Sequence, residues 1–174
     1  GLTYSKERKN PAARYQMLAF ANVHQDGLIV LATHRLVGNL ENFSMTKLIA
    51  GLGERFKITR YEFASPKAKI GAREKVLKQM KAEHKNDKNA FGVYGAGNAF
   101  YCAVLQDRDA MDRLVPDRSA AWRALDVSVL HKLILEGLLG IDEQKLARGE
   151  NVEYVKDTAN AIDDSIAQID AGRK

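Results

Sequence analysis

The chain has 174 residues and a net charge of +5, and 45% of its residues are hydrophobic while 28% are charged. These proportions suit a globular domain with an apolar core and exclude a chain that is disordered throughout. A single cysteine, Cys102, excludes an internal disulfide, and its apolar neighbours predict a buried, inert thiol in a reducing compartment.

The most apolar stretch, 127–141, is interrupted by Ser128, His131, Lys132 and Glu136. It is therefore too short and too polar to span a bilayer. No pattern typical of a secretion signal comes before the first predicted strand. The sequence predicts a cytoplasmic protein without a membrane partner.

Positive charge gathers in residues 57–88, which hold ten lysine and arginine residues against four acidic ones. Such a window could follow nucleic-acid phosphates. However, it has few interleaved aromatic residues, and lysines on the outer face of a helix are usually solvated. The sequence therefore argues against nucleic acid as a partner.

The first half of the chain predicts a hairpin, a helix and a strand, in that order. Residues 1–10 resemble the tail of a helix, and Asp26-Gly27 predicts a tight turn between strands near 15–24 and 28–34. A helix capped by Ser44 should run to about Arg55. A strand over 57–63 should follow, and its apolar residues change parity, which predicts a bulge or a strongly twisted edge.

Next, Ser65 and Pro66 predict the start of a basic helix that ends before Asn86. Residues 90–106 predict a second hairpin with the turn 95–98. This glycine-bearing turn superficially resembles a phosphate loop, but it joins two strands and leads into no helix, so we reject that interpretation.

The last third predicts mainly helices. A short helix is expected around 109–114, the stretch 119–124 carries the single tryptophan, and Asp126 should cap the most apolar helix of the chain, which must be central. Further expected elements are a short helix from Asp142 to Gly149, a strand at 152–155, and a last helix capped by Asp157 or Thr158. The sequence thus predicts one α+β domain over 1–174, with a mainly antiparallel sheet built from two hairpins and a further strand.

Two of the four histidines stand out as candidates for chemistry. His24 and His84 are expected at the surface, whereas His34 directly follows a buried strand and His131 lies on the most apolar helix. No two histidines have the helical spacing of metal ligands, so no metal site is predicted.

One interpretation of these polar residues is structural: His131 is a hydrogen-bonded core residue, and Arg35 pairs with an acid such as Asp126. The functional interpretation is that His34, Arg35 and His131 line a pocket for an anionic ligand. A guanidinium group binds phosphate or carboxylate through two hydrogen bonds, and a neutral imidazole can act as acid or base. His34 and His131 are then the catalytic candidates, with Arg35 and Asp126 as ligand-binding residues.

Three phrases of the chain carry a family resemblance: THRLV at 33–37, the run from Pro116 to Asp142 that includes LDVSVLH, and ENVEYVKD near 150. With these phrases the chain resembles the family of domain of unknown function 1015, whose members have an N-terminal half similar to the ParB and sulfiredoxin fold. The resemblance implies that the chain is the middle to C-terminal part of a longer protein, without that half.

The resemblance favours an intracellular phosphometabolite- or nucleotide-handling enzyme, and the alternative is a non-catalytic domain that packs on the absent half or on a partner. It assigns no substrate and no cofactor, and it leaves open whether the chain is an enzyme. In either case, apolar surface left uncovered on the first strand or last helix would favour a homo-oligomer.

Overall fold

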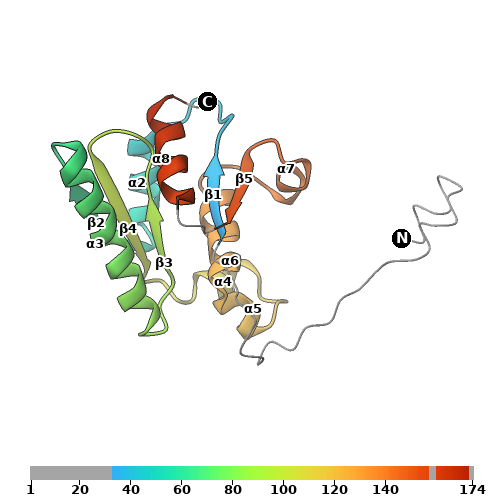
Figure 1. The fold of residues 1–174 in the computed structure, drawn as a ribbon. Helices are drawn as coiled ribbons and strands as arrows, with labels where there is room; N and C mark the ends of the chain where they lie inside the picture. Colours follow the sequence, from blue (N-terminus) through green and yellow to red (C-terminus); the bar gives the residue numbers. More distant parts are fainter. Residues whose placement is uncertain (1–32, 157–159, 173–174) are drawn as a thin grey trace, which may run out of the picture. The chain divides into compact units, whose positions relative to one another are not determined.

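The computed structural model describes residues 33–156 and 160–172, all within one compact unit, Thr33–Lys174. The predicted strand near 15–24 and most of its partner near 28–34 lie outside these residues. Figure 1 shows the elements in chain order: β1 (Thr33–Val37), α2 (Met45–Gly53), β2 (Phe56–Glu62), α3 (Pro66–His84), β3 (Ala90–Val93), β4 (Ala99–Leu105), α4 (Ala110–Leu114), α5 (Ala120–Ala124), α6 (Asp126–Val129), η2 (Leu130–Glu136), α7 (Glu143–Arg148), β5 (Val152–Lys156) and α8 (Ala161–Asp170).

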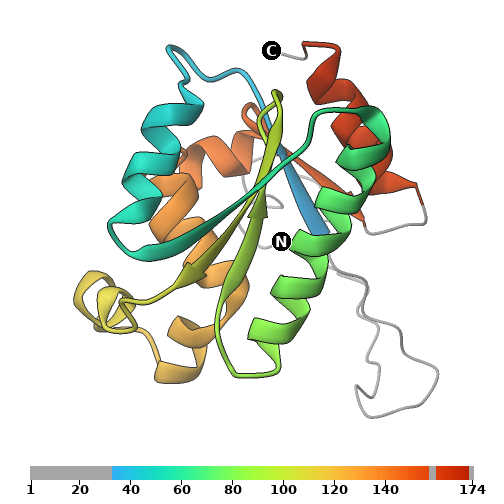
Figure 2. The same ribbon diagram turned by 90° about the vertical axis from the view of Figure 1, so that its left-hand side faces the viewer.

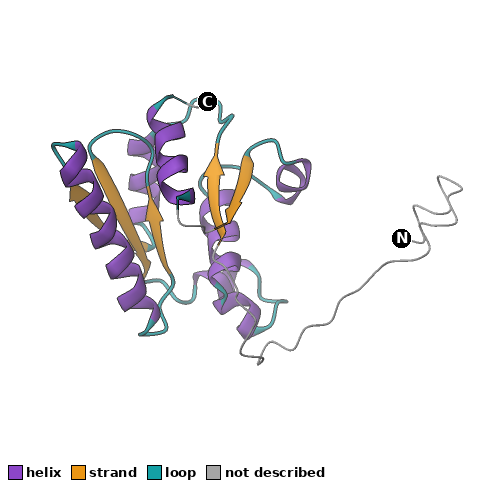
Figure 3. Ribbon diagram, in the orientation of Figure 1, coloured by secondary structure: helices purple, strands orange, loops and turns teal. Residues whose placement is uncertain are grey.

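The strands form two antiparallel sheets, which confirms the predicted α+β class (Figure 3). One sheet has the order β2-β4-β3 and contains the predicted second hairpin. The other is a pair, in which β1 lies antiparallel to β5 from Thr33 opposite Lys156 to Val37 opposite Val152. The expected single sheet is thus divided in two, because β5 comes from the far end of the chain to pair with β1.

Helix α3 covers one face of the three-stranded sheet, and α2 lies on the other side (Figure 2). Alternate residues of β4 face opposite ways. Phe100, Cys102 and Val104 pack against α3, whereas Ala103 and Leu105 pack against α2 and the later helices. Cys102 is fully buried, as predicted, and burial raises the pKa of its thiol to about 11.

Burial of both sheet faces also explains the change of parity in β2. Ile58 packs on the α2 side and Tyr61 on the α3 side. The pairing of β2 with β4 runs without a break from Phe56 to Glu62, so the predicted bulge is absent there. The other half of that prediction is confirmed, since β2 is an edge strand of this sheet.

The predicted central helix lies between the two sheets as α6 and η2. Leu133 and Ile134 belong to the core of the three-stranded sheet, and Leu135 packs with Ile141 and Val152 beside β1 and β5. The segment Leu130–Glu136 is a π-helix rather than the expected α-helix. Its wider turns are visible at its end, where the Leu139 amide donates to the Ile134 carbonyl at 3.1 Å.

Asp126 does not cap this helix, so that prediction was wrong. The N-cap position belongs to Leu125, and the Asp126 carboxylate instead accepts a hydrogen bond from the Asn89 side chain at 2.7 Å. Other caps are as predicted, because the side chains of Ser44, Ser65 and Asp142 each accept a hydrogen bond from the backbone amide three residues later. Ser119 caps α5 in the same way, which was not predicted. The last helix begins at Ala161, and its predicted caps, Asp157 and Thr158, lie outside the described residues.

Candidate functional site

Strand β1 presents Arg35 to the cross-strand residue Tyr154. The guanidinium carbon lies 5.4 Å from the centroid of the Tyr154 ring, and Nη1 donates a hydrogen bond to the Thr33 carbonyl. The Nε atom is buried and has no hydrogen-bond partner in the part of the chain that the structure describes. Burial lowers the pKa of Arg35, and the neighbouring Tyr154 partly opposes this effect. The guanidinium still carries its charge at neutral pH.

His131 lies on the π-helical segment η2 and shares the electrostatic environment of Arg35. Burial lowers the pKa of His131, and the positive charges of Arg35 and Lys132 lower it further, against the effect of Glu143. The imidazole is therefore neutral near pH 7. Its Nε2 atom is buried without a hydrogen-bond partner among residues 33–156 and 160–172.

Two acids compensate the charge of Lys132, which is next to His131. Its amine lies 2.7 Å from a Glu136 carboxylate oxygen and 3.1 Å from a Glu143 carboxylate oxygen. These hydrogen bonds, led by that of Glu136, raise the pKa of Lys132 despite its burial. Lys132 is therefore engaged, whereas Arg35, the other cation that lowers the pKa of His131, keeps a buried Nε atom without a partner in the described residues.

His34 faces the other side of the β1–β5 pair, because neighbouring residues of a strand point in opposite directions. It lines a groove of about 130 Å³ together with Arg73, Tyr94 and the α8 residues Ile162 and Ile166. The charge of Arg35 thus acts on His131, whereas His34 lies in a different environment, the groove beside α8.

The contacts that the structure gives Asp126 are with residues other than Arg35 and His131. Its carboxylate accepts the hydrogen bond from Asn89, and its second oxygen lies 3.9 Å from Nδ1 of His84. Both partners belong to the region between the end of α3 and the start of β3. These contacts tie the start of α6 to the three-stranded sheet.

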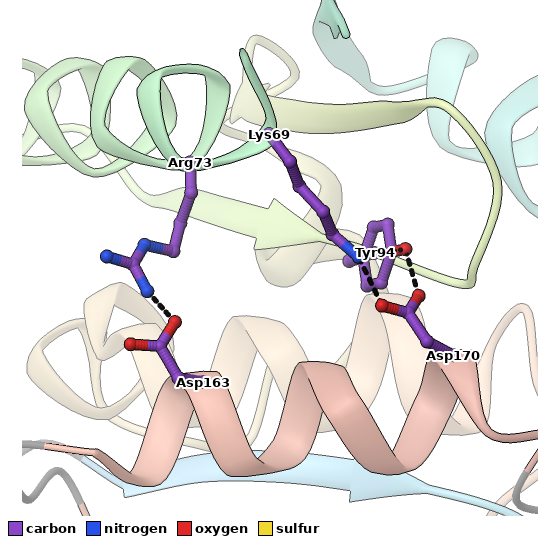
Figure 4. A network of polar contacts seen from close by, with 5 residues as sticks. All are labelled: Lys69, Arg73, Tyr94, Asp163 and Asp170. Carbon is purple, nitrogen blue, oxygen red and sulfur yellow. Dashed lines mark hydrogen bonds and ion pairs between the residues drawn. The ribbon is translucent and has the colours of Figure 1, made fainter. Parts of the chain in front are cut away.

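A polar network that the sequence analysis missed joins α8 to α3 and to the end of β3 (Figure 4). The Lys69 amine donates to the Tyr94 hydroxyl at 2.8 Å and to the Asp170 carboxylate, and the Tyr94 hydroxyl donates to Asp170 at 2.5 Å. Arg73 lies one turn after Lys69 on α3, and it pairs with Asp163, which lies two turns before Asp170 on α8. We call these five residues the α8 clamp.

Protonation states in the α8 clamp follow from these contacts. The hydrogen bonds from Lys69 and then Tyr94 lower the pKa of Asp170. Burial alone would lower the pKa of Lys69, but its hydrogen bonds to Asp170 and Tyr94 outweigh burial and raise it. Burial and the hydrogen bond to Asp170 raise the pKa of Tyr94. Lys69 and Asp170 are therefore a charged pair bridged by the neutral phenol of Tyr94. The signal in the sequence that could have revealed the clamp is the pair of basic residues spaced by four on α3, together with acidic residues on α8.

The described residues contain no group of three histidine, cysteine, aspartate or glutamate side chains that could hold a metal ion. No helix in the ranges 33–156 and 160–172 is long and apolar enough to cross a membrane.

Residues 2–128 match the model of the family described as protein of unknown function (DUF1015). The chain belongs to this family. The match includes His34, Arg35 and Asp126, whereas His131 lies just beyond it. No curated protein and no solved structure matches the chain. The chemical roles of His34, Arg35, Asp126 and His131 in this DUF1015 chain stay predictions.

Proposed function

We propose that this DUF1015 chain binds a small anion, a phosphate- or carboxylate-bearing metabolite, at Arg35 and His131. The observation that carries the proposal is that two electrostatically coupled side chains each keep a buried nitrogen without a hydrogen-bond partner in the described residues, Nε of Arg35 and Nε2 of His131. Buried polar atoms are nearly always satisfied, so such a pair is typical of a ligand site. This supports the phosphometabolite- or nucleotide-handling enzyme expected from the family resemblance.

An anion would change the balance of charge around His131. In the free protein, burial and the Arg35 charge keep the imidazole neutral. A bound anion beside both groups favours the imidazolium, because an opposite charge nearby stabilises the charged form. Binding should therefore take up a proton. In an enzyme, the same coupling would let His131 donate that proton to a ligand oxygen, with Arg35 holding the anion through charge-assisted hydrogen bonds.

Sulfate is the sharpest probe, because it does not titrate between pH 5.5 and 8 whereas phosphate does. Isothermal titration calorimetry across this range should give a sulfate affinity that rises as the pH falls, with proton uptake visible in buffers of different ionisation enthalpy. Arg35→Gln should weaken binding about tenfold or more, as expected for loss of a charge-assisted hydrogen bond. His131→Asn should remove the pH dependence.

Arg60→Gln is the matched control, because Arg60 is half exposed and already paired with Glu62 at 2.8 Å. It should leave sulfate binding unchanged. Equal affinities for wild type and Arg35→Gln, or a pH dependence that survives His131→Asn, would reject the site.

A second candidate function is a non-catalytic interaction domain. It is supported by three exposed apolar side chains, Leu114, Leu125 and Val127, in the segment of α4 to α6. The apolar residues of the last helix do not add to this surface, because Ile162 and Ile166 line the groove beside His34. A partner or a second copy of the chain would then cover the α4–α6 segment.

A further inference from the structure

A pocket of about 520 Å³ lies at the end of β1 that leads into α2. Its walls are the loop 38–44, the start of α2, residues 138–139 after η2, Lys145 of α7 and residues 150–151 before β5. Figure 2 shows the loop running from β1 (blue) into α2 (cyan). The volume falls in the range of small-molecule sites in proteins. Neither Arg35 nor His131 lines it.

Hydrogen bonds hold one wall of the pocket in place. The Asn39 side chain donates to the Glu150 carbonyl at 2.8 Å, and the Asn151 side chain donates back to the Asn39 carbonyl at 2.9 Å. The Gly38 amide donates to the Asn151 carbonyl at 3.0 Å, which extends the β1–β5 ladder. Two segments distant in the chain are thus fastened together, so the wall is formed before any ligand arrives.

Close packing fixes the opposite wall. A Cβ atom added at Gly51 of α2 would lie 2.9 Å from a Leu138 methyl group, so the helix and the 138–139 segment approach as closely as a glycine permits. Leu48 and Leu138 line the pocket from these two segments. Leucines from these two segments thus make part of the lining apolar, and we call this part the floor of the pocket.

The polar groups around this floor carry no net charge. Two lysines, Lys47 and Lys145, are matched by two glutamates, Glu41 and Glu150. Lys145 is further occupied, since its amine donates to the Gly140 carbonyl at 2.8 Å. This balance gives no preference for an anion, in contrast to Arg35 and His131.

The remaining lining combines an exposed ring with side-chain amides. Phe43 lines the pocket with 46% of its surface exposed, so its ring is accessible to a ligand there. Asn42 adds an amide group, which can pair with the donor and acceptor edge of a heterocycle. Asn151 can add its side-chain oxygen as an acceptor, because its amino group already donates to the Gly38 and Asn39 carbonyls. Carboxylates such as those of Glu41 and Glu150 accept hydrogen bonds from sugar hydroxyls.

From these features we infer that the pocket binds an uncharged nucleoside, with its base stacked on Phe43 over the leucine floor and its hydroxyls directed to the acidic rim. A flat ring with two apolar faces and a polar edge matches a floor of leucines and a rim of amides. A bare sugar would leave the leucines uncovered, and a nucleotide would bring its phosphate to a lining without excess positive charge.

The test is a set of NMR titrations of the ¹⁵N-labelled chain with adenosine, guanosine, cytidine and uridine. A separate titration with glucose serves as the reference. At least one nucleoside should shift the amide signals of residues 39–48, 138–145 and 150–151, and glucose should not. Phe43→Ala should weaken that nucleoside roughly 5- to 100-fold, the loss expected when a stacking ring is removed. Phe43→Tyr keeps the ring and should retain binding.

Arg35→Gln separates this inference from the anion site, since it should weaken sulfate binding about tenfold or more and leave nucleoside binding unchanged. The inference is overturned if no nucleoside shifts these signals at millimolar concentration, or if Phe43→Ala binds as wild type does. It is also overturned if the 5′-monophosphate binds more than about tenfold more tightly than its nucleoside, because that result requires a cationic lining.

Discussion

The two sheets of the compact unit differ in what their strands bury. The central strand β4 is apolar along its length and is covered on both faces, so Phe100 and Cys102 meet α3 while Ala103 and Leu105 meet the helices opposite. Strand β1 is mostly half-buried and carries His34 and Arg35 among its five residues. The comparison teaches that the two sheets differ in burial: the three-stranded sheet is covered on both faces, whereas β1 combines a contact to a core cluster with polar side chains.

The largest expected effect tests where the stability lies. Phe56→Ala removes a ring that is 4% exposed and packs edge-to-face on Phe91 at 6.2 Å, so it should lower the free energy of unfolding by about 3–5 kcal/mol. The matched truncation in the other sheet, Tyr154→Ala, removes a half-exposed ring and should cost less than about 1 kcal/mol. Urea unfolding measures both, and equal costs would refute the contrast between the sheets.

A smaller effect is expected at the α8 clamp, which fastens α8 over the groove that contains His34. Asp170→Asn weakens the hydrogen bonds with Lys69 and Tyr94 and should cost about 1 kcal/mol at pH 7, because the carboxylate is partly exposed and screened. The folded state lowers the pKa of Asp170 from 3.8, so its contribution is complete above pH 3.8 and is lost as the pH falls through the folded value.

Unfolding curves of wild type and Asp170→Asn should therefore differ at pH 7 and converge in acid. Asp117→Asn is the control, since Asp117 is exposed, and it should change stability by less than about 0.5 kcal/mol at either pH. A difference between wild type and Asp170→Asn that persists unchanged at pH 2 would show that the carboxylate charge does not hold α8.

The smallest effect on stability is expected at the exposed apolar side chains of the α4–α6 segment. Leu114→Gln combined with Leu125→Gln should change the free energy of unfolding by less than about 1 kcal/mol, because both side chains are about half exposed. If this segment is an interaction surface, sedimentation should show wild-type self-association that the double variant loses. If the wild-type chain stays monomeric at high concentration, self-association is not the role of the α4–α6 segment.

Much of the core could be predicted from the sequence, because its signals are local. The cap at Ser44, the Ser65-Pro66 start of α3 and the turn at 95–98 each depend on residues within one turn of the chain. The parity change in β2 was also visible, but choosing between a bulge and an edge required knowing that both sheet faces are covered. The π-helical winding of η2 was not predicted from the residues around it.

The candidate sites could be predicted only in part. His34, Arg35 and His131 were singled out because polar side chains on apolar elements need partners, which is a local argument. Which of them meet depends on β1 pairing with β5 and on η2 packing between the sheets. The α8 clamp and the pocket at Phe43 likewise join segments that are distant in the sequence.

The sequence by itself determined the α+β class, most helix starts and the family, because caps, turns and periodic apolar residues act over a few positions. Only the tertiary structure decided that the charge of Arg35 acts on His131 while His34 lines the groove beside α8. A strand sends adjacent side chains to opposite sides, and what lies on each side is set by elements that come about a hundred residues later.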